Sequence, residues 1–274
     1  MDIKAFKMDG LGNDFVIIDQ RNQNFNLKKD QIIQICDRNF IGCDQLIFIE
    51  KSKEKDAKLE FYNSDGSISG ACGNGTRCVA DLLSKENNDK EITLWTSSGS
   101  LNSKILGNNL VETEIGIPKI NWKEIPLSKK IDTKDLKIEI IDKDNNKHLG
   151  GIGVNVGNPH IIFFVNEFEN FDIKKIGPQI ENHKMFPEKC NVTIAKVINK
   201  NLIKVKVWER GAGLTKACGT AACATAFASK INNLTDNNTD IEFETGKLSI
   251  FIDEKNSIHM KGPVSDIKEI SIKL

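Results

Sequence analysis

The sequence of 274 residues contains short polar motifs that recur at an offset of about half its length. This repeat is the strongest constraint on the fold, because two copies of one unit are expected to fold alike. The matched motifs, offset by 145 or 146 residues, are Gly12-Asn13-Asp14-Phe15 with Gly157-Asn158-Pro159-His160, Gln45 with Asn191, Asn63 with Glu209, and Ala71-Cys72-Gly73-Asn74 with Ala217-Cys218-Gly219-Thr220. We therefore expect two pseudo-symmetric lobes, with equivalent loops facing each other across one cleft.

Strand patterns dominate the rest of the chain. Apolar and polar residues alternate at 58–62 and 203–207, as expected of half-buried strands. Further strands are predicted at 46–49, 91–95, 136–141, 160–165, 191–198 and 248–252. Helices are predicted at 30–39 and 172–182, and two more, at 74–85 and 219–230, begin next to the paired cysteines. The pattern indicates an α+β protein in which the strands of each lobe surround a central helix, with residues 121–134 as a crossover between lobes.

The charge balance and the N-terminus exclude several classes of function. Lys plus Arg and Asp plus Glu both total 38, so no charge excess points to nucleic acid or to a membrane surface. The first residues lack the apolar core of a signal peptide, and no apolar run reaches membrane-spanning length. We expect a cytoplasmic protein whose seven cysteines, an odd number, stay reduced.

Cys72 and Cys218 are the candidate catalytic residues, because each directly precedes a predicted helix. Unpaired N–H groups and the partial positive charge of a helix N-terminus lower a thiol pKa and bind a carboxylate. Two such thiols could act on opposite faces of an amino-acid α-carbon, one removing its proton and the other supplying one. This chemistry requires no cofactor.

Other cysteine chemistries fit the sequence less well. The spacings from Cys72 to Cys78 and from Cys218 to Cys223 do not match zinc motifs, so no metal is expected. A cysteine hydrolase needs a partner histidine, and only His160 lies in a motif. The remaining cysteines are expected to be buried small residues: Cys36, Cys43, Cys78, Cys190 and Cys223.

The motifs together resemble the diaminopimelate epimerase family. The resemblance is carried, in order along the chain, by Gly10-Leu11-Gly12-Asn13-Asp14-Phe15, Asn63-Ser64-Asp65-Gly66, Ala71 to Cys78, Gly157 to His160, Trp208 to Gly213 and Ala217 to Thr220. It implies two lobes, each a mostly antiparallel sheet rolled around a central helix, with the active site in the cleft between them. The lobes would be 1–117 and 118–262, and a last strand at about 263–274 would return to the first. Leu214 and Ala221 depart from residues common in the family.

The resemblance implies interconversion of L,L- and meso-diaminopimelate, for lysine and peptidoglycan precursors, without pyridoxal phosphate or metal. Cys218 would accept the proton in the L,L-to-meso direction and Cys72 would donate one. Substrate-binding positions implied by the family are Asn13, Gln45, Asn63, Gly73, Asn74, Asn158, Asn191, Glu209, Arg210, Gly219 and Thr220. His160 and Glu209 match positions that support catalysis, and a homodimer would be the assembly.

Two alternatives remain open from the sequence. A proline or hydroxyproline racemase would use the same pair of thiols, but its substrate has no distal amino acid. Asn63, Asn191, Glu209 and Arg210 would then have no obvious ligand. A catalytically inactive amino-acid-binding protein is the second alternative, and proton exchange into the substrate would separate it from an enzyme.

Overall fold

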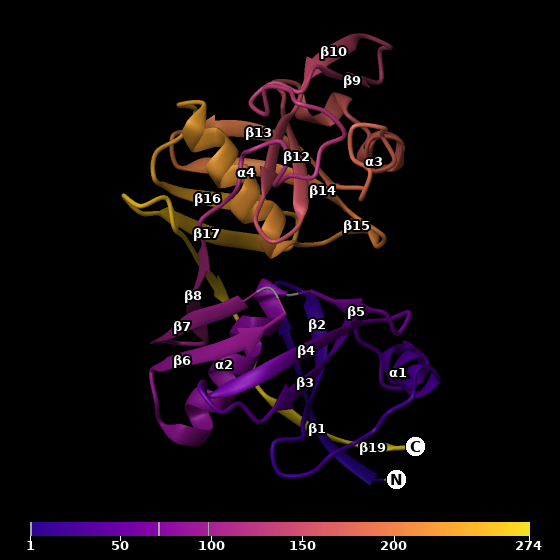
Figure 1. The fold of residues 1–274 in the computed structure, drawn as a ribbon, viewed down its shortest axis with the longest axis vertical. Coiled ribbons are helices and arrows are strands. Elements are labelled where there is room, and N and C mark those ends of the chain that lie inside the picture. The colour runs from indigo at the N-terminus through magenta and orange to yellow at the C-terminus, as the bar shows by residue number, and fades with distance from the viewer. Residues whose placement is uncertain (1, 71, 98) are drawn as a thin grey trace. The chain divides into compact units, whose positions relative to one another are not determined.

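The computed structural model describes residues 2–70, 72–97 and 99–274, so Ala71 of the first cysteine motif lies outside the described residues. The chain forms two compact units, Met1–Glu114 with Lys261–Leu274, and Ile115–Met260 (Figure 1). We call them unit 1 and unit 2. The chain passes from one unit to the other within two strands, β8 (Leu110–Gly116) and β18 (Ile258–Pro263).

Unit 1 is a strongly curved mixed sheet. Its other strands are β1 (Asp2–Gly10), β2 (Asn13–Asp19), β3 (Gln45–Glu50), β4 (Ala57–Asn63), β5 (Ile68–Ser69), β6 (Glu91–Thr96), β7 (Gly99–Gly107) and β19 (Lys268–Lys273). Most neighbours are antiparallel, but β2 pairs with β3 and β4 with β6 in parallel. A helix lies within each of the two parallel connections: α1 (Lys29–Cys36) and α2 (Gly73–Asn87). This agrees with the need of parallel strands for a crossover.

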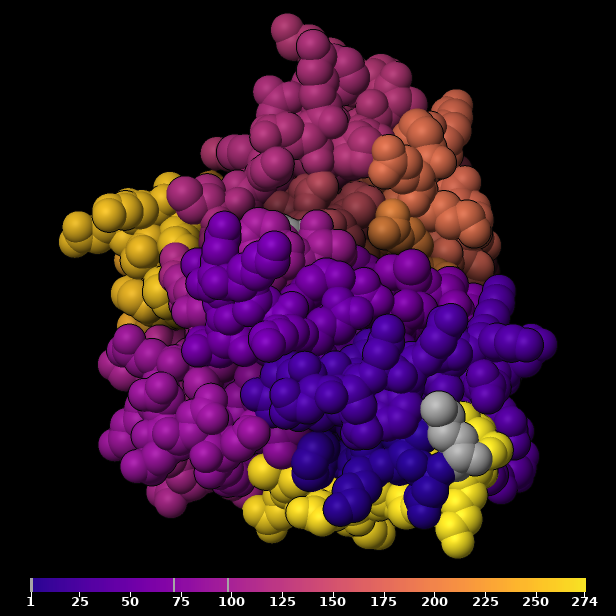
Figure 2. Space-filling view, turned by 60° about the horizontal axis from the view of Figure 1, so that its bottom comes forward, coloured from indigo at the N-terminus to yellow at the C-terminus, as the bar shows by residue number. Residues whose placement is uncertain are grey.

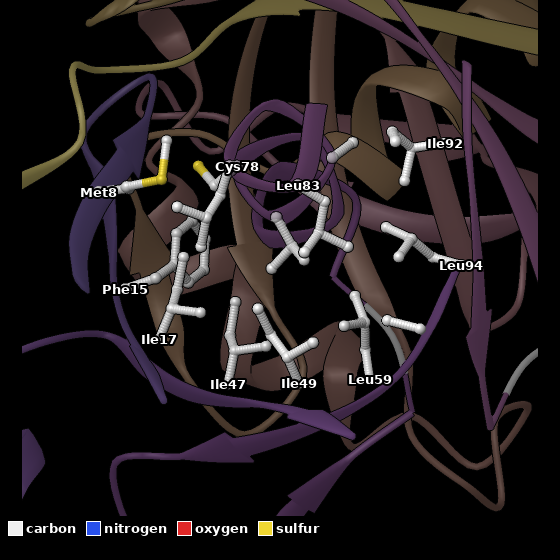
Figure 3. Packing of buried hydrophobic residues seen from close by; sticks show 14 of the residues in the cluster. Met8, Phe15, Ile17, Ile47, Ile49, Leu59, Cys78, Leu83, Ile92 and Leu94 are labelled. Carbon is white, nitrogen blue, oxygen red and sulfur yellow. The ribbon is translucent and has the colours of Figure 1, made fainter. Parts of the chain in front are cut away.

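Helix α2 is the centre of unit 1. Its buried Cys78, Val79 and Leu83 pack with side chains from β1, β2, β3, β4 and β6, which point toward the helix in Figure 3. Helix α1 covers a different face, where Ile32 and Ile35 join a second cluster with Ile272 of the last strand. The two faces of β2 therefore belong to two different cores, so it reads as a continuous apolar run.

The C-terminal strand β19 lies beside the N-terminal strand. It pairs with β1 in antiparallel register, Asp2 opposite Lys273 and Lys7 opposite Lys268. Figure 2 shows this yellow segment next to the indigo start of the chain. Both ends of the chain are thus held in unit 1.

Unit 2 repeats this plan and adds a separate two-stranded sheet formed by its first two strands. Its strands are β9 (Ile138–Ile141), β10 (Lys147–Gly150), β11 (Ile152–Asn155), β12 (Pro159–Phe164), β13 (Asn191–Asn199), β14 (Leu202–Glu209), β15 (Gly213–Thr215), β16 (Asn238–Phe243) and β17 (Gly246–Ile252). The helices α3 (Ile173–Glu181) and α4 (Gly219–Ile231) correspond to α1 and α2, and a short 3₁₀ turn covers Phe168–Asn170. Helix α4 is buried on nearly every face and consists largely of small residues such as alanine, glycine, serine and threonine, which lets the strands around it approach closely.

The strand registers confirm the internal repeat. Residues that pair in unit 1 have counterparts, offset by 145 to 147 positions, that pair in unit 2. These pairs are Phe15–Gln45 with His160–Asn191, Phe61–Ser69 with Val207–Thr215, and Leu94–Leu101 with Ile241–Leu248. Parallel neighbours also match, β2–β3 with β12–β13 and β4–β6 with β14–β16. The expected α+β fold with duplicated lobes, each with a central helix, is confirmed.

The predicted elements differ from the structure mainly at their ends. Strand β9 begins at Ile138 rather than at residue 136, because Lys137 has a positive φ of 54° that interrupts extended backbone. The helix predicted to reach residue 39 ends at Cys36. The segment 121–134 has no regular element and buries Ile125 and Leu127 in the core of unit 2. Within the part of the chain that the structure describes, no helix combines the length and apolar character needed to span a membrane.

Candidate active site

Cys72 and Cys218 occupy the same structural position in the two units. Each is the N-cap residue of its central helix, with φ and ψ of −139° and 110° at Cys72 and −138° and 114° at Cys218. The helices begin at Gly73 and Gly219, so the first backbone N–H groups of each helix lie directly after the thiol. The sequence predicted this placement correctly.

Around Cys72, one asparagine side chain contacts the thiol and a second asparagine contacts the first. The Gly75 N–H donates to Sγ at 3.5 Å, and Sγ lies 3.7 Å from Oδ1 of Asn13. The same oxygen accepts a hydrogen bond from Nδ2 of Asn74 at 3.3 Å. Asn74 is buried, and its own Oδ1 accepts from the fully buried Arg77 at 2.7 Å. The amide of Asn13 is thereby oriented with its oxygen toward the thiol.

Asp44 holds the other end of the Asn13 side chain. Its Oδ2 accepts hydrogen bonds from Asn13 Nδ2 at 2.9 Å and from the Asp14 N–H at 3.1 Å. The exposed Arg38 bridges the carboxylates of Asp44 and Asp14. Burial alone would raise the pKa of Asp14, but Arg38 keeps it below its ordinary value. Asp44 was not among the residues predicted from the sequence.

Gln45 and Asn63 lie opposite each other on the adjacent strands β3 and β4. Nε2 of Gln45 donates to Oδ1 of Asn63 at 2.9 Å, and Asn63 Nδ2 donates to Ser67 Oγ at 3.0 Å. The predicted binding residues of unit 1 therefore form two hydrogen-bonded groups. Asp44 contacts Asn13 in the first group, and the next residue along the chain, Gln45, belongs to the second group.

Around Cys218, the equivalent positions carry a hydroxyl, an amide and an imidazole. Sγ lies 3.4 Å from Oγ1 of Thr220, which accepts from Asn158 Nδ2 at 3.5 Å. Asn158 Oδ1 lies 2.8 Å from Nε2 of His160. The unit thus connects the thiol to a histidine through two polar side chains.

The protonation of Cys218 differs from the sequence prediction. A helix N-terminus was expected to lower the thiol pKa, but burial raises the pKa of Cys218 well above its ordinary value. The Glu209 carboxylate raises it further, because two negative charges would repel, while the Thr220 hydroxyl and the Ala221 N–H oppose the increase. Cys218 is therefore a neutral thiol in this state.

His160 is fully buried and neutral. Burial and, secondarily, the positive charge of Arg210 lower its pKa to about 3. A neutral imidazole carries one proton on its two nitrogens, so Nε2–H can donate to the Asn158 oxygen. At neutral pH this histidine orients Asn158 and does not contribute a charge.

The other predicted residues of unit 2 gather where β14 turns into β15. Asn191 accepts from the Arg210 N–H at 3.0 Å through Oδ1 and donates to the Pro159 carbonyl at 3.0 Å through Nδ2. Nη1 of Arg210 donates to the Glu188 carbonyl at 3.0 Å. Asn191 is buried and Arg210 is exposed. The amide therefore fixes the backbone, while the guanidinium remains accessible to solvent.

The five remaining cysteines are buried, as the sequence suggested. Cys36 and Cys43 face each other with their sulfurs 3.5 Å apart. Among residues 2–70, 72–97 and 99–274, no group of three or more His, Cys, Asp or Glu side chains is arranged to hold a metal ion.

Comparison with known structures shows that the same fold occurs in several solved proteins. A phenazine biosynthesis protein of the PhzF family from Bacillus anthracis superposes with a TM-score of 0.69 at 15% identity, with both chains fully covered. A hydroxyproline epimerase from Agrobacterium vitis superposes with a TM-score of 0.68 at 10% identity, covering 98% of this chain and 91% of that one. At these identities the likeness concerns the fold alone.

Sequence comparison gives the family. The family model described as diaminopimelate epimerase matches residues 5–121 and 152–267. A protein named diaminopimelate epimerase from Pelagibacter ubique is 80% identical over 274 residues, with both chains fully covered. The chain belongs to the diaminopimelate epimerase family, and it is an isomerase.

Proposed function

We propose that this protein interconverts L,L- and meso-diaminopimelate by proton transfer between two cysteines and one α-carbon, with no cofactor. The reaction supplies meso-diaminopimelate for lysine and peptidoglycan precursors. The observation that supports the two-cysteine assignment best is the duplication. Two thiols occupy the same N-cap position, with the same backbone conformation, at the starts of the two central helices.

Each thiol is placed for a proton transfer beside a carboxylate-binding group. The substrate carboxylate would accept hydrogen bonds from the N–H groups of Gly73-Asn74 and Gly219-Thr220, where the helix dipoles favour negative charge. Those donors would also stabilise the negative charge that moves into this carboxylate when the α-proton leaves. One sulfur takes that proton and the other delivers its own to the opposite face.

The neutral Cys218 thiol is suited to the donor half of this cycle. In the L,L-to-meso direction, Cys218 must first lose its proton to serve as the base. The Glu209 carboxylate lies close enough to raise its pKa and could receive that proton. His160 would support the step by orienting Asn158, and through it Thr220 beside the sulfur.

The substrate is proposed from the charged and amide side chains at the ends of the strands in both units. Diaminopimelate has a second amino acid group at its distal end. Arg210 would pair with the distal carboxylate, and Asn63 and Asn191 would complete the shell around it. Glu209, which also interacts with the Cys218 thiol, would pair with an ammonium group of the substrate. Proline and hydroxyproline have no such group, so they are the weaker candidates.

The assembly and location are also proposals. A homodimer in the cytoplasm fits the family resemblance. Light scattering after size-exclusion chromatography would test the dimer, since a mass near the 30.6 kDa of one chain would contradict it.

The substrate is tested by incubating the reduced enzyme with L,L-diaminopimelate, L-proline or trans-4-hydroxy-L-proline in deuterated water. We expect deuterium at the α-carbon and the meso isomer with diaminopimelate only. Exchange with proline alone would favour the racemase alternative. Exchange with none of the three would leave an amino-acid-binding protein.

A further inference from the structure

We propose that Glu181 is a positioning residue, which holds the turn between β14 and β15 in the conformation that presents Glu209 and Arg210 to the substrate. This inference rests on the proposed function, because it assigns a role to the turn that would bind the distal end of the substrate. Glu181 is the last residue of α3, far from the turn in sequence, and only 6% exposed.

The Glu181 carboxylate accepts one hydrogen bond on each side of the Glu209-Arg210 pair. Oε2 accepts from the Trp208 indole Nε1–H at 2.8 Å, and Oε1 accepts from the Gly211 N–H at 3.0 Å. Residues 208 and 211 flank the pair directly. One buried carboxylate thus fixes the position of both ends of the two-residue segment, and charge-assisted bonds of this kind are among the stronger ones.

The indole of Trp208 transmits the position of α3 to the turn. A Cβ at Gly177 of α3 would lie 2.3 Å from Trp208 Cγ, so the helix accepts the indole only because this residue is glycine. The far edge of the indole lies against Gly213, where an added Cβ would be 3.5 Å away. The indole ring therefore lies between helix α3 and the β15 end of the turn. Its N–H donates a hydrogen bond to the Glu181 carboxylate.

The contacts of Arg210 complete the arrangement. Its N–H donates to the buried Asn191, and its guanidinium donates to the Glu188 carbonyl. With Glu181, these contacts fix the backbone before, within and after the pair. A fixed backbone reduces the ordering that substrate binding would otherwise require, and this raises affinity.

In the equivalent turn of unit 1, the carboxylate that accepts hydrogen bonds belongs to the turn itself. There Asp65 accepts hydrogen bonds from the N–H and the hydroxyl of Ser67, and the Gly66 N–H donates to the Asn63 carbonyl. The turn of unit 1 carries Asn63 where unit 2 carries Glu209. Unit 2 thus uses a carboxylate from a distant helix at the turn that bears the charged pair.

The test compares Glu181→Gln with Glu169→Gln, a matched loss of one carboxylate at an exposed position of the same unit. Glutamine keeps the size of the side chain but can accept only one of the two hydrogen bonds, and its amide hydrogens would face the other donor. We expect KM for L,L-diaminopimelate to rise roughly tenfold in Glu181→Gln, the loss of about one charged hydrogen bond. The value of kcat should change less than KM, and Glu169→Gln should match the wild type.

A second readout reports the contact itself. The indole ¹H resonance of Trp208, identified by its loss in Trp208→Phe, is expected to move upfield in Glu181→Gln as the carboxylate acceptor is removed. Trp208→Phe removes one of the two donors and keeps the hydrogen bond from the Gly211 N–H to Glu181. Its KM should therefore rise less than that of Glu181→Gln. This variant also decides the question if Glu181→Gln does not fold.

Several outcomes would overturn the inference. An unmoved indole resonance would contradict the contact, and a moved resonance with wild-type KM would contradict the positioning role. A lower melting temperature with equal KM would leave Glu181 a merely structural residue. If the wild type itself shows no epimerisation, the proposed function fails, whereas the indole shift still tests whether Glu181 holds the turn.

Discussion

Replacing Gly75 by alanine should disturb the start of helix α2, and with it Cys72. A Cβ at this position would lie 2.7 Å from Ile47 Cδ1, 3.0 Å from Phe61 Cε1 and 3.4 Å from Phe15 Cε1. All three neighbours are at most 1% exposed, so none can rotate into solvent. The methyl group must displace either these three side chains or the helix terminus.

The expected magnitude follows from two opposing effects. Alanine favours a helix over glycine by about 1 kcal/mol in a helix interior and by less in this first turn. Overpacking a closed core costs typically about 1–3 kcal/mol. We expect a net destabilisation of about 1–2 kcal/mol, which would lower the melting temperature by a few degrees for a protein of this size. Movement of the helix start should also lower kcat, because the thiol and its N–H groups move together.

The assay is thermal unfolding with parallel kinetics, and Gly150→Ala is the matched control. No heavy atom lies within 4 Å of a Cβ at Gly150, and its φ is not positive. That variant should unfold at or slightly above the wild-type temperature. A Gly75→Ala variant as stable and active as the wild type would refute the packing argument. Unit 2 already carries alanine at the equivalent, fully buried position, Ala221.

Three further results are expected. The free energy of unfolding should decrease as the pH falls below about 6.5, because buried His160 has a pKa of about 3 while the same histidine in the unfolded chain binds a proton near 6.5. At pH 5 the loss in the free energy of unfolding is about 2 kcal/mol. Denaturant unfolding of the wild type and His160→Gln at pH 5 and 7.5 should show a smaller pH effect in the variant, and equal effects would contradict this. Asp44→Ala should lower kcat/KM by about three- to tenfold, since Asn13 loses one hydrogen-bonded anchor, and wild-type kinetics would count against that role. Glu209→Gln should lower the pKa of Cys218, so iodoacetamide should alkylate this thiol faster at a given pH. Peptide mass spectrometry would follow the alkylation, and an unchanged rate would show that burial alone raises the pKa of Cys218.

The repeat made much of this fold predictable from the sequence. Matching Cys72 with Cys218 and Asn63 with Glu209 correctly indicated equivalent helix starts and strand ends. Local patterns could not define β2, since both of its faces are buried and its residues do not alternate. Helix α3 was predicted despite its internal Pro178.

The features that escaped prediction depend on contacts between distant segments. Glu181 reaches a turn about 30 residues later and has no counterpart in the repeated motifs, so nothing local distinguishes it from a surface glutamate. The pKa of Cys218 depends on how deeply the whole unit buries it, which the helix-start argument did not include. Asp44, which directly precedes Gln45, could have been suspected from its neighbour.

Removing Cys72 and Cys218 in turn is the most direct test of whether they are the two acid–base groups. Wild type, Cys72→Ala and Cys218→Ala would be incubated, reduced, with L,L-diaminopimelate in deuterated water, with α-deuterium and stereochemistry followed over time. We predict that the wild type forms deuterated meso product and that neither variant does, while Cys223→Ala, a buried cysteine on α4, retains activity. Epimerisation at the wild-type rate by either Cys72→Ala or Cys218→Ala would contradict the two-cysteine mechanism.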